Sequence, residues 1–301
     1  MKPVRTAVFP VAGFGTRMLP ATKAVPKELL PIVDRPAIQY VVDEAREAGI
    51  EHFVFVTSRG KHAIEDYFDH HFELEASLSA KDNSEAVQQL HDNRIGCGQA
   101  SFTRQQQPLG LGHAIGCARR LVGDEPFAVL LPDMVMRSQP GCLKQLVQVY
   151  EEQGGGNVVA LERMPTSDLH KYGVANILDR VDGAPRITGM VEKPKPGQAP
   201  SNLVNSGRYI LQPEIFDCLD KTPPGTGGEI QLTDAMVQLL KQQPFWGMVF
   251  KGDTFDVGSK LGYLCANVAY GSSHPEIGGL FRHEIENVLR KFNRKMSPTA
   301  A

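Results

Sequence analysis

A loop rich in glycine, with three cations in it or just after it, is the first segment of the sequence that could do chemistry. It reads VAGFGTRMLP, contains Gly13, Gly15 and Arg17, and is followed closely by Lys23 and Lys27. Glycines after a strand expose backbone N–H groups and allow a phosphate to approach the chain. Several cations beside such a loop suit a polyphosphate. A solvated basic turn is an equally good interpretation of these residues taken alone.

Spacing excludes two better-known phosphate loops. A dinucleotide-binding loop needs a third glycine, and Met18 occupies that position. The GxxxxGK[ST] pattern of a P-loop is absent from the sequence. The sequence therefore argues against a nicotinamide-dependent oxidoreductase, which a titration with NAD(H) would test.

Asp133 is the strongest candidate among the carboxylates. It follows the apolar run Phe127–Leu131, which we predict to be a central strand. A carboxylate at the carboxyl end of a buried strand lies where α/β folds bind ligands. An aspartate that caps a helix or closes a loop is the alternative. Asp256 precedes a predicted helix at 258–270, a place that is also typical of a turn aspartate.

The elements around these residues predict a parallel sheet. Apolar runs predict strands at 6–11, 52–57, 100–104, 127–131 and 158–163. Periodic segments predict helices at 36–48, 61–70, 113–121 and 141–153, with a polar helical excursion at 73–95. Such an alternation of strands and helices argues for parallel strands joined by right-handed crossovers.

The second half of the sequence has a different pattern. Strands predicted at 173–178, 187–192 and 208–211 are separated by turn residues, which indicates a more antiparallel sheet layered onto the first. Helices at 229–242 and 258–270 flank a strand at 247–250. Residues 280–295 then carry an apolar stripe at helical spacing. That amphipathic tail packs on its own domain or contacts another subunit.

Composition limits the class of protein. The chain has 301 residues and a net charge of −2, which is enough material for a large α/β domain and gives no basic excess for binding nucleic acid. The apolar runs are too short for a signal peptide or a membrane span. Five cysteines without a CxxC pair favour a reducing interior. We therefore expect a cytoplasmic protein without nucleic-acid or membrane partners.

Taken together, the motifs resemble those of the sugar-1-phosphate nucleotidyltransferases. The signature is seen in GFGTRMLP and PKELLP, and similarity continues through GLGHAIGCA, EKPKPGQAPSN, KTPPGTGGEIQLTDA and DVGSKLGY along nearly the whole chain. The resemblance implies an α/β, Rossmann-like three-layer nucleotide-diphospho-sugar transferase fold. Its sheet is mixed and mainly parallel, with an added small antiparallel sheet and a C-terminal helical extension. The implied domain is 1–275, with nucleotide-binding and sugar-binding parts at about 1–135 and 136–275, before a helical tail at 276–301.

The resemblance also implies a reaction. UTP transfers its uridylyl group to α-D-glucose 1-phosphate, giving UDP-glucose and pyrophosphate with the help of Mg²⁺. The attacking phosphate has a second pKa near ~6, so it is largely ionised at pH 7 and needs no general base. The protein must instead hold two polyanions in line and neutralise the leaving group. Members of the family form dimers or tetramers, which implies a homodimer or a homotetramer.

Roles for individual residues follow from the resemblance. It implies that the catalytic residues are Arg17, Lys27, Asp133 and Lys193. Around the nucleotide it places Ala12, Gly13, Gly15, Thr16, Glu28, Gln105 and Gly110. The amide of Gln105 can both donate to and accept from a base. Gly173, Glu192 and Lys193 would contact the sugar phosphate, while Asp133 and Asp256 would hold the metal.

The sequence departs from the family pattern at three positions. Gln106 and Leu109 stand where glycine and lysine are usual, and Asn205 lies in an unusually polar run. These departures bear on the base loop and on the far wall of the sugar pocket. An enzyme for dTTP or another hexose 1-phosphate is an alternative, because thymine presents the same hydrogen-bonding edge as uracil. A non-catalytic sensor of sugar nucleotides is another alternative, although the four catalytic residues are present.

Overall fold

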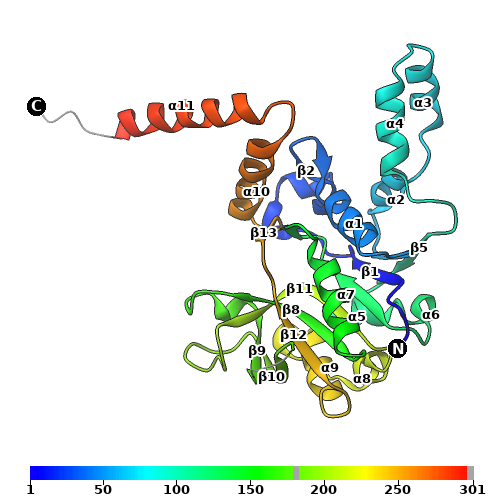
Figure 1. Cartoon of the computed structure of the whole chain (residues 1–301), viewed down its shortest axis with the longest axis vertical. Coiled ribbons are helices and arrows are strands. Elements are labelled where there is room, and N and C mark those ends of the chain that lie inside the picture. The colour runs from blue at the N-terminus through cyan, green and yellow to red at the C-terminus, as the bar shows by residue number, and fades with distance from the viewer. Residues whose placement is uncertain (179–182, 297–301) are drawn as a thin grey trace, which may run out of the picture.

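One mixed sheet of nine strands runs through the computed structural model, which describes residues 1–178 and 183–296 (Figure 1). In order across the sheet, the strands are β5 (Ala100–Arg104), β4 (His52–Thr57), β1 (Thr6–Pro10), β6 (Phe127–Leu130), β11 (Leu203–Leu211), β8 (Asn157–Arg163), β12 (Phe245–Val249), β10 (Arg186–Glu192) and β9 (Gly173–Leu178). The first four run parallel, as the alternation of elements predicts. The other neighbours are antiparallel, except β8 and β12.

Helices cover both faces of this sheet, which confirms the predicted three layers. The helices of one face include α1 (Ala37–Glu47), α2 (His62–Phe68) and α7 (Cys142–Glu152). The other face carries α5 (Leu111–Gly116), α6 (Arg119–Val122), α8 (Ile215–Lys221) and α9 (Leu232–Leu239). Successive strand residues alternate between the two cores, as Val158 and Val159 of β8 do. Strands such as β6 are therefore apolar without interruption.

Small antiparallel sheets are also present, but they are built from segments other than those expected. β7 (Met134–Arg137) pairs with β13 (Asp253–Asp256), and β2 (Pro31–Ile32) pairs with β3 (Arg35–Pro36). The strands predicted at 173–178, 187–192 and 208–211 were expected to form a sheet layered on the first, but they belong to the main sheet: β9 and β10 extend one edge, and β11 lies in the middle. An alternation of apolar and polar residues indicates that one face of a strand is exposed, but it does not indicate which sheet the strand joins or at which position.

Several local predictions need correction. The helix expected at 113–121 begins at Leu111 and is divided into α5 and α6, and the helix expected at 229–242 spans only α9. Neither α8 nor β13 was among the expected elements. The excursion at 73–95 is helical, as predicted: α3 (Phe72–Ser79) and α4 (Ser84–Asn93) form a hairpin that projects from the body (Figure 1).

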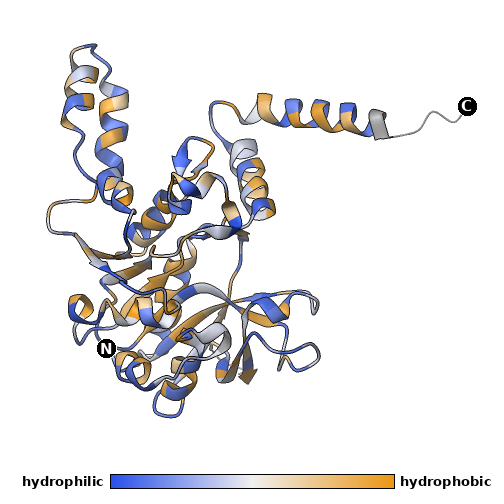
Figure 2. Cartoon of the chain, turned by 180° about the vertical axis from the view of Figure 1, so that it is seen from behind, coloured by the Kyte–Doolittle hydropathy of each residue, from blue (hydrophilic) through white to orange (hydrophobic). Residues whose placement is uncertain are grey.

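The chain leaves the sheet through two C-terminal helices, α10 (Lys260–Ser273) and α11 (Gly278–Met296). α10 packs on the body, where Ala266 is buried, whereas α11 extends away from it (Figure 1). Hydrophobic and hydrophilic residues alternate around α11 (Figure 2), in agreement with the predicted amphipathic tail. The last five residues of that tail, 297–301, lie outside the described residues. Within 1–178 and 183–296, no helix has the length and apolar character needed to cross a membrane.

Candidate active site

Four charged side chains gather where β7 and β13 pair. Asp133 precedes β7 and Asp256 ends β13, so the antiparallel pairing of Met134 with Asp256 brings the two carboxylates to one place. Lys27 Nζ lies 2.6 Å from Asp133 Oδ2. The Arg17 guanidinium lies 3.5 Å from Asp133 and 3.0 Å from Asp256. Segments far apart in the sequence thus meet in one cluster, and all four residues were predicted for the site.

A glycine keeps the space between these groups open. A Cβ atom at Gly258 would stand 2.6 Å from an Arg17 nitrogen, 3.0 Å from Asp133 Oδ2 and 3.1 Å from Asp256 Oδ1. Any side chain at this position would therefore occupy the point on which both carboxylates converge. Gly258 lies two residues after Asp256 in the run FDVG, and no local pattern distinguishes it from the other glycines as one that faces the site.

The cluster holds Asp133 and Lys27 in their charged forms. Burial favours the neutral form of the Asp133 carboxyl, but Lys27 and Arg17 outweigh that effect and lower its pKa. Burial likewise favours a neutral Lys27, but Asp133 and Glu28 raise the pKa of its ammonium group. A carboxylate and two cations therefore coexist at neutral pH, which is the charge pattern that a polyphosphate and a metal ion require.

A cleft of about 380 Å³ opens beside the cluster. The glycine loop, the segment around Gln105 and the cluster all contribute to it, and its lining includes Ala12, Gly13, Phe14, Thr16, Lys27, Gln105, Gly110, Asp133 and Glu229. Most of the predicted nucleotide-binding residues therefore share one cavity at the carboxyl ends of β1 and β6. This is the edge at which α/β sheets bind their ligands.

The side chain of Gln105 is fixed within this cleft. Its Nε2 donates to the Gly110 carbonyl oxygen at 3.0 Å and lies 3.0 Å from His113 Nδ1. Gly110 has a φ of 97°, and a Cβ atom there would stand 2.6 Å from Glu229 Cβ, so only glycine fits this turn. His113 begins the helix predicted at 113–121, and the structure makes it a neighbour of the Gln105 amide.

Glu28 lies in a place different from the one predicted. Its side chain is 1% exposed and pairs with Lys61 at 2.6 Å, outside the lining of the cleft. Burial raises the pKa of Glu28 despite the nearby Lys61 and Lys27. Burial also lowers the pKa of Lys61 despite Glu28. The structure therefore places Glu28 outside the lining of the cleft, paired with Lys61 and close to Lys27.

The predicted sugar-side residues form a second group at the ends of β9 and β10. Glu192 accepts a hydrogen bond from Thr233 Oγ1 at 2.6 Å, and Lys193 Nζ lies 3.6 Å from the same carboxylate. Lys193 has a φ of 45°, which a non-glycine residue rarely adopts, and its N–H donates to the Tyr172 carbonyl oxygen. A turn of the backbone therefore presents a carboxylate and a cation from two consecutive residues, Glu192 and Lys193.

A buried ion pair supports the segment that carries Asp133. Arg208 is fully buried and donates to Glu44, with a shortest distance of 2.8 Å. Its guanidinium also donates to the carbonyl oxygens of Leu131 and Met134, on either side of Asp133. We did not identify either charged residue from the sequence. The only available signal was an arginine at the start of the strand predicted at 208–211.

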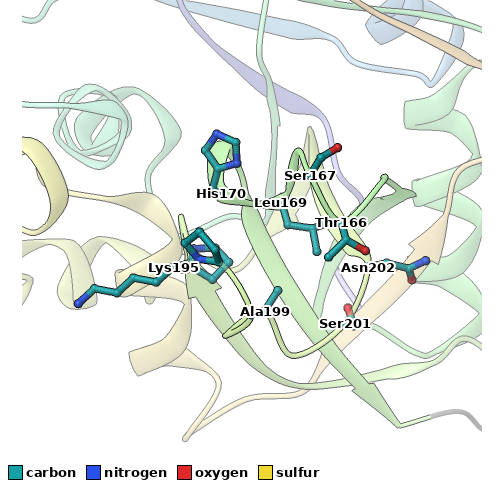
Figure 3. A pocket seen from close by; sticks show the side chains of 11 residues that line it. Thr166, Ser167, Leu169, His170, Lys195, Ala199, Ser201 and Asn202 are labelled. Atoms are coloured by element: carbon teal, nitrogen blue, oxygen red, sulfur yellow. The ribbon is translucent and has the colours of Figure 1, made fainter.

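Another cavity, of about 430 Å³, lies near the sugar-side group between two surface segments (Figure 3). Its lining includes Thr166, Ser167, Leu169, His170, Lys195, Ala199, Ser201 and Asn202. These are residues other than those predicted for the site, although Lys195 is only two positions after Lys193. Leu169 and Ala199 supply apolar surface, and the polar groups belong to exposed loops.

Comparison with known proteins identifies the family to which the chain belongs. Residues 7–273 match the nucleotidyl transferase family. The UTP–glucose-1-phosphate uridylyltransferase of Staphylococcus haemolyticus is 45% identical over 92% of this chain and 96% of its own length. A UTP-bound UGPase from Acinetobacter baumannii has a TM-score of 0.86 at 42% identity, covering 94% of this chain and 98% of that one. A UDP-glucose pyrophosphorylase complexed with UDP-glucose has a TM-score of 0.80 at 42% identity, covering 90% and 100%.

Identity and coverage of this extent exceed what a shared fold alone would give. They also agree with the motifs, which occur in the family order along nearly the whole sequence. The chain belongs to the nucleotidyl transferase family, together with the UTP–glucose-1-phosphate uridylyltransferases.

Proposed function

We propose that this chain is an enzyme that transfers the uridylyl group of UTP to α-D-glucose 1-phosphate and releases pyrophosphate. The observation that carries the proposal is the position of Lys27 and Asp133 in the lining of the glycine-loop cleft, with Arg17 paired to Asp133. The relatives support it, since one is named for this reaction and two solved structures contain UTP or UDP-glucose.

The chemistry requires charge neutralisation more than proton transfer. An oxygen of the sugar phosphate forms a bond to the α-phosphorus of UTP, and the bond from that phosphorus to the bridging oxygen breaks as pyrophosphate leaves. We assign Arg17 and Lys27 to the β- and γ-phosphates, where two cations offset the charge of the leaving group. Because Asp133 and Glu28 raise the pKa of Lys27, that residue keeps its charge at physiological pH.

Nucleotidyltransferases of this kind generally use a divalent metal ion, and we assign Mg²⁺ to this chain. Asp133 and Asp256 fit that role, because Gly258 leaves open the point on which their oxygens converge. Among the described residues, no cluster of three or more histidine, cysteine or acidic side chains could hold a metal alone. Two carboxylates completed by phosphate oxygens and water suit Mg²⁺. When bound, the ion would neutralise phosphate charge and orient the reacting groups.

Recognition of the two substrates is divided between the two ends of the site. We assign the N–H groups of the glycine loop and the Gln105 amide to the nucleotide, with Gly110 allowing close approach; the loop residues are Ala12, Gly13, Gly15 and Thr16. Gly173 and Glu192 would contact the hexose, and Lys193 would pair with its phosphate. Gln105 fits uracil and thymine equally, so the nucleotide preference has to be measured.

We also infer a cytoplasmic homodimer or homotetramer. All five cysteines are free thiols, as a reducing compartment maintains. α11 presents Leu280, Val288, Leu289 and Phe292, each more than half exposed, as an apolar face for another subunit. The proposed boundary between the domain at 1–275 and the tail at 276–301 falls just before α11. Deleting residues 281–301 should lower the mass measured by light scattering; an unchanged mass would contradict a role for the tail.

The test of the reaction is pyrophosphate release by the purified chain with Mg²⁺. UTP, dTTP, CTP, ATP and GTP would each be combined with glucose 1-phosphate, galactose 1-phosphate and N-acetylglucosamine 1-phosphate. We expect strong release with UTP and glucose 1-phosphate only. Release with another pair would overturn the substrate assignment and keep the reaction class. A folded protein that releases no pyrophosphate with any pair would support the alternative of a non-catalytic sensor of sugar nucleotides.

A further inference from the structure

Asn205 lies at a break in the regular pairing of β11. The register between β11 and β8 shifts between Asn205 and Tyr209, and Gly207 adopts a φ of 80° within the irregular segment. Bulges of this kind redirect side chains and occur next to active sites. Just before the bulge, β11 also pairs with β9, through Val204 and Val174. This pairing brings Asn205 to the end of β9 at which the proposed sugar contacts lie.

Three polar side chains converge on one point above Gly173. A Cβ atom at that glycine would stand 2.7 Å from Asn205 Nδ2, 2.8 Å from Thr233 Oγ1 and 3.0 Å from Glu192 Oε2. The groups come from β11, α9 and β10, three elements that no local sequence pattern connects. Gly173 thus leaves room for a set of hydrogen-bonding groups, and Asn205 belongs to that set.

Asn205 differs from its two neighbours in one respect. Thr233 and Glu192 satisfy each other through a hydrogen bond of 2.6 Å. The Asn205 side chain is only 8% exposed, yet neither its Nδ2 nor its Oδ1 has a hydrogen-bond partner within the described part of the protein. Buried amides are nearly always paired, because leaving one unpaired is unfavourable. An unpaired amide at this point is therefore a candidate for pairing with a ligand.

We propose that the Asn205 side-chain amide binds a hydroxyl group of the hexose 1-phosphate and thereby contributes to sugar specificity. An amide offers a donor and an acceptor, and a hydroxyl group likewise donates and accepts. The phosphate of the same substrate needs a cation, which Lys193 supplies, so the uncharged amide is suited to the sugar ring. This proposal rests on the proposed function, whose sugar side includes Glu192 and Gly173.

The experiment compares the wild type with Asn205→Leu, which keeps the number and branching of the side-chain heavy atoms and removes both polar atoms. Rates would be measured with UTP and glucose 1-phosphate, then with its 2-, 3-, 4- and 6-deoxy analogues. The variant should lose about tenfold in kcat/KM for glucose 1-phosphate while the KM for UTP stays unchanged. The wild type should lose a similar factor when one particular hydroxyl is missing. The variant should be indifferent to that same hydroxyl.

Thermal unfolding separates a ligand contact from a structural role. Because Asn205→Leu removes an unpaired buried amide, its Tm should exceed that of the wild type by roughly a few degrees. A side chain with a structural partner would lower the Tm instead. Ser206→Ala is the matched control, since Ser206 is the next residue and also has a buried, unpaired hydroxyl. The control should keep the deoxy-sugar ratios of the wild type.

The results distinguish this proposal from the proposed function. A wild type that is inactive with UTP and glucose 1-phosphate contradicts the proposed function and, with it, the assignment of Asn205 to this hexose. An active wild type whose four deoxy-sugar ratios are unchanged in Asn205→Leu contradicts only the Asn205 contact. A lowered Tm with unchanged ratios overturns the proposal in favour of a structural role.

Discussion

Ion pairs of two kinds lie on either side of Asp133. Toward the cleft, the carboxylate meets Lys27 and Arg17, and the Arg17 side chain is 58% exposed. Toward the core, Arg208 is completely buried and bonds to Glu44 and to the carbonyl oxygens that flank Asp133. The same two charge types occur in both places. What differs is access to water and to ligands.

This difference in access distinguishes a cation that a ligand can reach from a cation with a structural role. An exposed arginine can exchange a carboxylate for a phosphate at little cost, because water and salt already screen its pairing. A buried arginine cannot leave its partner without stranding a charge in the core. We therefore expect substitutions in the cleft to change turnover and those in the core to change stability.

The largest expected effect is on the cleft side. Asp133→Ala should reduce turnover at least about a thousandfold at any Mg²⁺ concentration, because it removes a proposed metal ligand and leaves Lys27 without its carboxylate. Steady-state pyrophosphate release measures this effect, and circular dichroism checks the fold. Asp124→Ala, at an exposed aspartate, is the control and should behave like the wild type. Substantial activity in Asp133→Ala would refute the metal role.

The next effect is on the core side. Arg208→Met should lower the free energy of unfolding by about 3–5 kcal/mol, since it leaves Glu44 buried without its partner. Urea unfolding measures this loss. The double variant Glu44→Leu/Arg208→Met should regain much of it, because no unpaired charge remains. If Arg208→Met proved as stable as the wild type, the contrast between the two sides would fail.

Lys193 sharpens the comparison, because it is another exposed cation placed beside a carboxylate. Its side chain is 38% exposed, and its Nζ is 3.6 Å from Glu192. Lys193→Ala should raise the KM for glucose 1-phosphate about tenfold or more and leave the KM for UTP and the unfolding free energy nearly unchanged. Initial-rate kinetics with each substrate varied in turn provide the measurement. An effect confined to UTP would place Lys193 at the other end of the site.

The smallest effect concerns pH and the second buried pair, Glu28–Lys61. Burial raises the pKa of Glu28, so the folded chain takes up a proton before the unfolded chain does as the pH falls toward 4.5. Burial lowers the pKa of Lys61, so the folded chain loses a proton first as the pH rises toward 10.5. The free energy of unfolding of the wild type, minus that of Glu28→Gln/Lys61→Met, should therefore increase toward both ends of this pH range and be smallest between them.

Urea unfolding of both proteins across that pH range tests this prediction. The pH dependence that Asp133 contributes has the opposite sign. Its pKa is lowered, so the stability that it contributes is present above its usual pKa and is lost as the pH falls through the lowered pKa. The exposed pair Arg5–Glu51, changed to Met and Gln, is the control and should give a flat difference. A Glu28–Lys61 difference that is equally flat would contradict the assigned pKa shifts.

Much of this arrangement could be predicted from the sequence, and the failures share a cause. The glycine loop, Lys27 and Asp133 belong to short motifs at strand ends, and their positions follow from local pattern and parallel topology. Glu28, Arg208 and Asn205 depend on partners or neighbours that lie far away in the chain. Glu28 and Lys61 are 33 residues apart, and Arg208 and Glu44 are 164 apart. Charge type alone does not tell whether such a residue meets water or a buried partner.

The fold was predicted with the same limits. Apolar runs correctly predicted β1, β4, β5, β6 and β8, because periodicity reports burial directly, whereas the two helical layers were implied by the family resemblance. The placement of β9 and β10 in the main sheet could not be read, since alternation is the same in either sheet. β13 was also missed, because its four residues, DTFD, carry no apolar pattern. Its pairing with β7, which no local signal reveals, is nevertheless what brings Asp256 to the site.

That pairing has a consequence for the newly made chain. Synthesis proceeds from the N-terminus, and domains form as their segments emerge. The glycine loop, Lys27 and Asp133 all lie within the first 133 residues, but Asp256 arrives only with β13. A chain stalled before residue 253 would carry most of the anion-binding groups and lack the second carboxylate. The cluster of two cations and two carboxylates is thus completed only late in translation.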